Sequence, residues 1–191
     1  LVLKQRLYGD AHPEIAAELN NLAYTLQSKR DFAGAESFYR QALGMNIKLL
    51  GPDHPDVAFT ENNLAWLLYR KGDLKGAVSL MRHVLGSRRR SLGAEHPDVA
   101  AAAASLAHWL IDLRDYDEAS RLVEESIAIR EKALGKEHPQ TTGSLLVKSD
   151  LMLATGRPEE ARSLAIEAQR ILRISLPEDS WQVARAVNNE G

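Results

Sequence analysis

The sequence predicts an all-α fold in which antiparallel helix pairs stack into an array. Three observations predict it: a fixed period of 42 residues, proline and glycine at matching points of each period, and apolar residues at helical spacing between them. His-Pro recurs at 12–13, 54–55, 96–97 and 138–139. A fixed period of this size is the sequence signature of a repeat array. We therefore expect function on a surface built by several repeats and not in one catalytic motif.

Each repeat is expected to begin with a helix, named A, that the His-Pro pair opens. Proline suits the first helical position because its missing N–H has no partner there. The acidic or amide residue that follows meets the positive end of the helix dipole. The fifth copy has Ser180, a strong N-cap type, in place of histidine, so we interpret the histidines as helix caps. The predicted A helices cover residues 13–29, 55–71, 97–113 and 139–155.

A turn of two or three residues leads to a second helix, named B, and so short a turn makes the two helices antiparallel. Asp31, Asp73 and Asp115 are the expected N-caps of three B helices, and Pro158 begins the fourth. A glycine, at Gly9, Gly51, Gly93 and Gly135, ends the helix before it because it reaches positive φ without a Cβ clash. The predicted B helices cover residues 32–49, 74–91, 116–133 and 158–175.

The period divides the chain into four complete repeats of one solenoid domain, at residues 9–50, 51–92, 93–134 and 135–176. Residues 1–8 match the end of a preceding repeat, and residues 177–191 match the start of a fifth. We interpret the chain as a fragment of a longer protein.

The composition excludes several classes of function. The formal net charge of the 191 residues is −2, so no global basic field argues for nucleic acid. The absence of cysteine excludes disulfides and Cys-ligated zinc. No apolar run reaches the roughly 18 residues of a membrane span. We expect no cofactor, no metal, no nucleic-acid or membrane partner, and a cytoplasmic location.

The second repeat resembles the tetratricopeptide repeat at Asn63-Leu64-Ala65, Leu68-Tyr69, Gly72-Asp73-Leu74 and Ala77. That family usually has a period of about 34 residues. The longer period and the segments G-x-x-H-P-D-V-A and N-N-L-A resemble the branch typified by kinesin light chains. The resemblance covers nearly the whole chain. It implies a right-handed α-solenoid, with A helices lining a concave groove and B helices outside, and a non-enzymatic scaffold that binds a peptide or partner segment.

The resemblance also implies which residues face the groove. Carried over repeat by repeat, they are Asn20, Asn21, Tyr24, Gln27, Phe59, Asn62, Asn63, Trp66, Tyr69, Arg70, Ala104, His108, Asp112, Leu146 and Asp150. An asparagine carboxamide both donates and accepts, so asparagine pairs on successive A helices can bond a peptide backbone. The pair is present in repeats one, two and five but is Ala104-Ser105 in repeat three and Leu146-Val147 in repeat four. The alternative is that one asparagine of each pair, Asn21 or Asn63 before Asn20 or Asn62, bridges its helix to the backbone of the neighbouring one.

One column of the A helices carries an anchor-like side chain in each repeat: Tyr24, Trp66, His108 and Asp150. Aromatic side chains with a polar tip suit peptide anchors. The alternative for Trp66 is a core position, but Leu64, Leu67 and Leu68 already fill the usual core columns. We expect a groove that is rich in asparagine and aromatic residues at repeats one and two, and small and apolar at repeats three and four.

Two further clusters have competing interpretations. His108 and Asp112 share a helix face near Asp150, and such residues can hold a metal or relay a proton. No nucleophile accompanies them, so we interpret them as hydrogen-bonded groove residues. The basic run Arg88-Arg89-Arg90, near Arg82 and His83, is interpreted as a solvated face at a helix C-terminus. Docking to an acidic partner is its alternative, and it could also pair with Glu124, Glu125 and Glu131.

Two other functions remain open beside the scaffold. The repeats could be the sensor segment of a larger switch protein, which holds an NTPase or protease domain inactive until a ligand binds. They could also be a self-assembly module, because the ends of a truncated array leave apolar helix faces uncapped and able to associate end to end.

Overall fold

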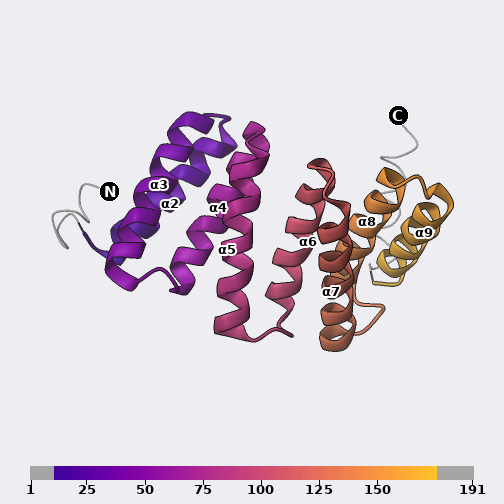
Figure 1. The fold of residues 1–191 in the computed structure, drawn as a ribbon. Helices are drawn as coiled ribbons and strands as arrows, with labels where there is room; N and C mark the ends of the chain where they lie inside the picture. Colours follow the sequence, from indigo (N-terminus) through magenta and orange to yellow (C-terminus); the bar gives the residue numbers. More distant parts are fainter. Residues whose placement is uncertain (1–10, 176–191) are drawn as a thin grey trace. The chain divides into compact units, whose positions relative to one another are not determined.

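The computed structural model describes residues 11–175, and every regular element within that range is an α-helix (Figure 1). The A helices are α2 (Pro13–Ser28), α4 (Pro55–Lys71), α6 (Pro97–Asp112) and α8 (Pro139–Ala154). The B helices are α3 (Phe32–Leu50), α5 (Leu74–Leu92), α7 (Tyr116–Leu134) and α9 (Pro158–Ser175). The predicted all-α class is confirmed, and each predicted helix agrees with the observed bounds to within one residue.

Some predictions lie outside the described residues. These are the end of a preceding repeat at 1–8, the start of a fifth repeat at 177–191, and the serine cap and asparagine pair expected in that fifth copy.

The histidines before the A helices are caps, as the sequence predicts. In every case the imidazole Nδ1 accepts the backbone N–H two residues further on, at 3.1 to 3.2 Å. The four capping residues are His12, His54, His96 and His138. Each bond satisfies one of the backbone donors that the first helical turn leaves without a partner.

Aspartates cap three B helices in the same way. Asp31 accepts from the N–H of Gly34 at 2.9 Å, and Asp73 accepts from the N–H of Gly76 at the same distance. Asp115 caps α7 through the N–H of Glu118. These local bonds explain why the helix boundaries can be predicted from the sequence.

The described residues fall into two compact units, residues 11–94 and residues 95–175. The first, the N-terminal unit, contains α2 to α5; the second, the C-terminal unit, contains α6 to α9. In both units each A helix packs against the B helix that follows it.

A column of buried alanines lies where the B helices meet their A helices: Ala35, Ala77, Ala119 and Ala161. Around it, the N-terminal unit buries Ile15, Leu64 and Met81, and the C-terminal unit buries Leu106 and Trp109. Small side chains at this point let the paired backbones approach closely, while the larger ones fill the space on either side. The A helices also have faces that do not take part in this core and are exposed to solvent.

Candidate functional site

The A helices of the N-terminal unit expose three aromatic side chains. Tyr24 of α2 is 63% exposed, and Phe59 and Trp66 of α4 are 56% and 38% exposed. In contrast, Leu64 and Leu67 of α4 are completely buried. The alternative that Trp66 is a core residue is therefore wrong, and the surface position expected from the filled leucine columns is confirmed.

Two ring contacts hold the end of this face. Trp66 and Tyr69 meet edge to face, with ring centroids 6.1 Å apart and planes at 87°. The guanidinium of Arg70 lies 5.4 Å from the centroid of the Phe32 ring on α3, which is a cation–π distance. These contacts limit the side-chain motion of three predicted groove residues, Trp66, Tyr69 and Arg70.

The asparagines divide into two roles. Asn63 of α4 donates its carboxamide N–H to the Oδ1 of Asn20 on α2 at 3.2 Å, and Asn20 is only 6% exposed. This pair bridges neighbouring A helices, as the alternative interpretation allowed, although the bond joins two side chains and does not involve backbone. Asn21 is exposed and Asn62 is half-buried, and their carboxamides make no hydrogen bond within residues 11–175. These two carboxamides therefore remain available on the face.

Gln27 also has a partner inside the fold. Its Oε1 accepts a hydrogen bond from the hydroxyl of Tyr39 on α3 at 3.3 Å. Burial raises the pKa of Tyr39 to about 12. The neutral phenol therefore persists as a donor at any physiological pH. Gln27 thus helps to fix α2 against α3.

An open pocket of about 180 Å³ lies between α2 and α4, with Asn20, Asn21 and Phe59 among its walls. Asn46 of α3 also lines it, and its carboxamide donates to Thr60 Oγ1 at 3.3 Å and to the Asp56 carbonyl at 3.5 Å. Sequence reasoning missed Asn46 because it considered only A helices. A polar residue in the mostly apolar run of a B helix is the signal that could have identified it.

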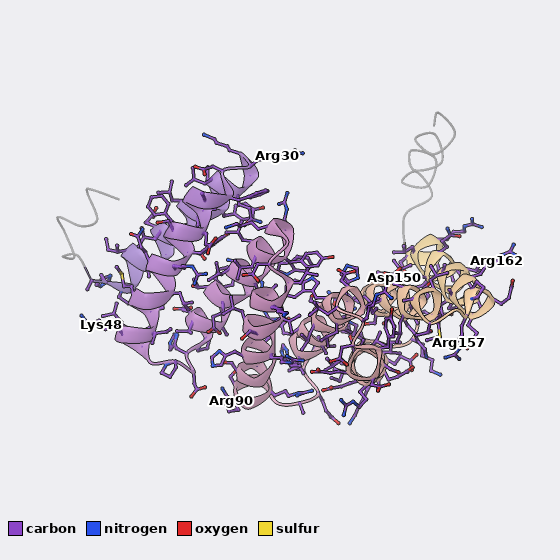
Figure 2. The ribbon with its side chains drawn as sticks, turned by 45° about the horizontal axis from the view of Figure 1, so that its top comes forward. Arg30, Lys48, Arg90, Asp150, Arg157 and Arg162 are labelled. Carbon is purple, nitrogen blue, oxygen red and sulfur yellow. The ribbon has the colours of Figure 1, made fainter. Side chains whose placement is uncertain are left out.

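The A helices of the C-terminal unit present a different face. Leu146 and Leu153 of α8 are exposed, while Ala104 of α6 is buried. His108 of α6 and Asp150 of α8 lie side by side, with Nδ1 and Oδ2 3.7 Å apart, and Asp112 is exposed nearby on α6. The expected closeness of His108 and Asp150 is confirmed, and Figure 2 shows where Asp150 lies. Within residues 11–175 no group of three or more histidine and carboxylate side chains could hold a metal ion.

Charged pairs cover much of the remaining surface. Arg90, at the end of α5 in Figure 2, pairs with Asp53, and His83 contacts the buried Glu61 at 2.6 Å. Glu124, expected as a partner of the arginine run, contacts Lys148 at 2.7 Å. Arg90 of the basic run therefore has an acidic partner within its own unit, whereas Glu124 pairs with Lys148 and not with the run.

A second pocket, of about 460 Å³, lies between α7, α8 and α9. Lys148 and Glu124 line it, as do Arg157 and Glu160, which pair with each other. Charges of both signs line this pocket, so it offers no single sign of charge to a ligand.

Comparisons with known proteins agree with this architecture. The family model of the tetratricopeptide repeat matches residues 14–90, 72–132 and 98–174. A search of curated proteins found no match. Within residues 11–175, no helix combines the length and the apolarity needed to cross a membrane.

Several solved structures share the fold. A Podosopora anserina protein with nearly identical TPR-like repeats, described as a kinesin light chain, is 25% identical with a TM-score of 0.79; the match covers 93% of this chain and 84% of that one. A single-residue variant of it is 25% identical with a TM-score of 0.80 and coverages of 91% and 82%. BtubC (BKLC) from P. vanneervenii is 22% identical with a TM-score of 0.77; the match covers 86% of this chain and 66%, just under two thirds, of that one.

The family match and the helix-by-helix agreement lead to one assignment. Tetratricopeptide repeats generally serve as protein-interaction scaffolds and are typically not catalytic. The chain belongs to the tetratricopeptide repeat family, and the solved structures that it resembles are kinesin light chain-like repeat proteins.

Proposed function

We propose that this chain is a non-enzymatic scaffold that binds a peptide or partner segment on the solvent-exposed faces of its A helices, the faces expected to line a concave groove. The observation that carries the proposal is the exposure of Tyr24, Phe59 and Trp66 on α2 and α4. Phe59 also lines the pocket between these two helices. Large aromatic side chains gathered on one surface favour an interaction site, because covering them removes apolar area from water.

Hydrogen-bonding groups beside the aromatic residues suit an extended peptide. Asn21 and Asn62 have carboxamides without a partner in residues 11–175, and each can donate to and accept from a backbone amide. Such bonds do not depend on the ligand's side chains. The aromatic residues would then supply the preference for particular side chains.

Hydrogen bonds between the helices that carry these residues favour binding, because they fix the helices before a partner arrives. The bonds of Asn63 to Asn20 and of Tyr39 to Gln27 hold α2 against α4 and α3. A partner would therefore meet helices that need little rearrangement, which lowers the entropy cost of association.

The C-terminal unit offers aliphatic contacts instead. Leu146 and Leu153 are exposed on α8, beside the His108 and Asp150 pair. We propose that this face of the C-terminal unit contacts aliphatic side chains of a partner segment.

The test starts from peptides selected on the intact chain from a random display library. We expect Trp66→Ala to weaken the selected peptide at least about tenfold, because a central aromatic anchor carries a large share of interface energy. Asn62→Ala should weaken it less. The matched control is Ile47→Ala, which truncates an exposed apolar residue of the B helix α3 and should leave the affinity unchanged.

Equal affinities for the wild type, Trp66→Ala and Asn62→Ala would reject the A-helix face as the binding site. A cytoplasmic location, the sensor role and end-to-end self-association stay predictions; light scattering over a concentration series tests the last of them.

A further inference from the structure

Arg130 of α7 reaches across to the first turns of α8 in the C-terminal unit. Its Nη1 donates to the carbonyl oxygen of Gln140 at 2.6 Å and to the hydroxyl of Ser144 at 2.9 Å. Ser144 is buried, and its hydroxyl also lies 2.7 Å from that of Ser126 on α7. One arm of the guanidinium is thus fixed by a buried network.

The rest of that guanidinium has no partner within residues 11–175. Its Nε is buried and makes no hydrogen bond. Its Nη2 makes none either, yet it is not among the buried atoms, so it remains accessible to solvent. No carboxylate forms an ion pair with Arg130 there, and burial lowers the pKa of its guanidinium.

Four other arginines of the described residues differ in this respect. Arg40, Arg90, Arg157 and Arg170 each pair with a carboxylate and lie at the surface. A half-buried cation without a counter-charge is costly, because it loses hydration and gains no ion pair in return. Arg130 is therefore a half-buried cation without an ion-pair partner in residues 11–175.

Gly143, an exposed residue of α8, lies beside the Nη1 arm of the guanidinium. A Cβ built at this exposed residue would lie 3.2 Å from Nη1 of Arg130, closer than most Cβ contacts. Gly143 occupies the repeat position held by Phe59 in α4, which is one of the exposed aromatic residues. At this repeat position the N-terminal unit exposes the ring of Phe59, whereas the C-terminal unit has no side chain and the guanidinium of Arg130 lies beside Gly143.

We propose that Arg130, in the gap at Gly143, binds a carboxylate carried by a partner segment. The inference rests on the proposed function, since it names the chemistry of a partner on the A-helix faces. An anion placed there would pair with the guanidinium and lie near the positive end of the α8 dipole. A carboxylate suits the site better than a phosphate. Only Nη2 is open for a new bond, whereas a phosphate has three acceptor oxygens and nearly twice the charge to satisfy.

The experiment follows the arginine Nε–Hε signals of the intact chain by NMR. The probes are the blocked tripeptides acetyl-Gly-Glu-Gly-amide and acetyl-Gly-Gln-Gly-amide, and inorganic phosphate, all at one ionic strength. The Arg130 signal is assigned by its loss in Arg130→Met. We expect the glutamate tripeptide to shift this signal saturably, and the glutamine tripeptide and phosphate to leave it in place.

Variants make the assignment specific. Gly143→Ala narrows the gap and should weaken the glutamate tripeptide at least about threefold. Arg130→Lys keeps the charge but loses the second arm, and should weaken it about tenfold, as measured from the backbone amide signals of α8. Arg121→Met removes an exposed arginine from the same helix and should change nothing. Circular dichroism confirms that each variant folds.

Three results would overturn the proposal. These are no shift of the Arg130 signal, an equal shift with the glutamine tripeptide, and a shift with phosphate at concentrations no higher than those of the glutamate probe. Trp66→Ala separates this site from the aromatic face: the glutamate response should survive in that variant even if peptide selection on α2 and α4 fails.

Discussion

The two units join a B helix to the next A helix through the same pair of bonds but with different side chains. In the N-terminal unit, Asn46 donates to the carbonyl of Asp56 and to the hydroxyl of Thr60. Two periods later, Arg130 donates to the carbonyl of Gln140 and to the hydroxyl of Ser144. The acceptors occupy matching repeat positions, so the junction is held in the same way in both units.

What differs is the surface above that junction. The short amide of Asn46 lines the same pocket as Phe59, whereas the long guanidinium of Arg130 lies beside Gly143. A large side chain on one element is matched by a small one on the other, as close packing requires. The comparison shows that both units keep the same pair of hydrogen bonds between a B helix and the next A helix. The side chains at this point decide whether the surface beside it is aromatic or cationic.

The largest expected effect separates two tryptophans that lie in different units. Trp109→Ala should lower the free energy of unfolding by about 3–5 kcal/mol, because it empties a fully buried site in α6. Trp66→Ala should lower it by less than about 1 kcal/mol, since that ring is partly in solvent. Urea unfolding followed by circular dichroism measures both. Similar losses would show that Trp66 supports the core of its unit.

The next effect concerns the Asn20 and Asn63 bond, whose positions are Ala104 and Val147 in the C-terminal unit. Asn63→Val alone should cost about 1–3 kcal/mol, because it leaves the buried carboxamide of Asn20 without its donor. Adding Asn20→Ala reproduces the apolar pair and should recover most of that loss. A double variant whose loss equals the sum of the single losses would contradict a bridging role.

A third change introduces into repeat four a core leucine that repeats two and three have at the matching position. Lys148 stands where repeats two and three have the buried leucines Leu64 and Leu106. We expect Lys148→Leu to stabilise the C-terminal unit by about 1 kcal/mol, because the gain in apolar burial exceeds the loss of a surface pair with Glu124. Lys132→Leu, at an exposed paired lysine of α7, is the control and should bring no gain. A lower unfolding midpoint for Lys148→Leu would disprove the interpretation.

The smallest effect is electrostatic. Hydrogen bonds from Lys71 and Arg40 hold the pKa of Glu36 below its usual value of 4.5. The folded state thus favours the charged form, so its stabilising contribution is present above the unfolded pKa and is lost as the pH falls through the folded pKa. Glu36→Gln should cost less than about 1 kcal/mol at neutral pH, and nothing once both states are protonated.

Glu160 of the C-terminal unit, whose pKa Arg157 lowers by a hydrogen bond, provides the comparison for Glu36. It is more exposed, so Glu160→Gln should show a weaker dependence on pH. Unfolding midpoints measured at a series of pH values test both, and a loss for Glu36→Gln that stays constant down to acid pH would refute the assigned cause.

The helices could be predicted because their signals are local. His54 bonds a backbone group two residues away, and Asp73 bonds one three residues away, so the chain carries each boundary in a few neighbouring residues. The filled leucine columns likewise indicate that Trp66 faces outward. These are short-range consequences of helical geometry.

The side-chain roles on the faces were harder to predict because they depend on distant pairs. Asn20 and Asn63 are 43 residues apart in sequence, and the residues around each of them do not indicate that their carboxamides are hydrogen-bonded to each other. Arg130 looks like an ordinary surface residue until its reach to α8 and the small size of Gly143 are seen together. Such pairings arise from packing between elements, which a repeat pattern alone does not specify.

The alanine column between paired helices has a consequence for how such proteins diverge. Alanine has no side-chain rotamers to lose on folding, and a larger residue there would force the helices apart. Because these alanines are buried, a change on the outward face leaves them undisturbed. A lineage built from this hairpin can therefore acquire a new recognition chemistry without altering the spacing at which that chemistry is displayed.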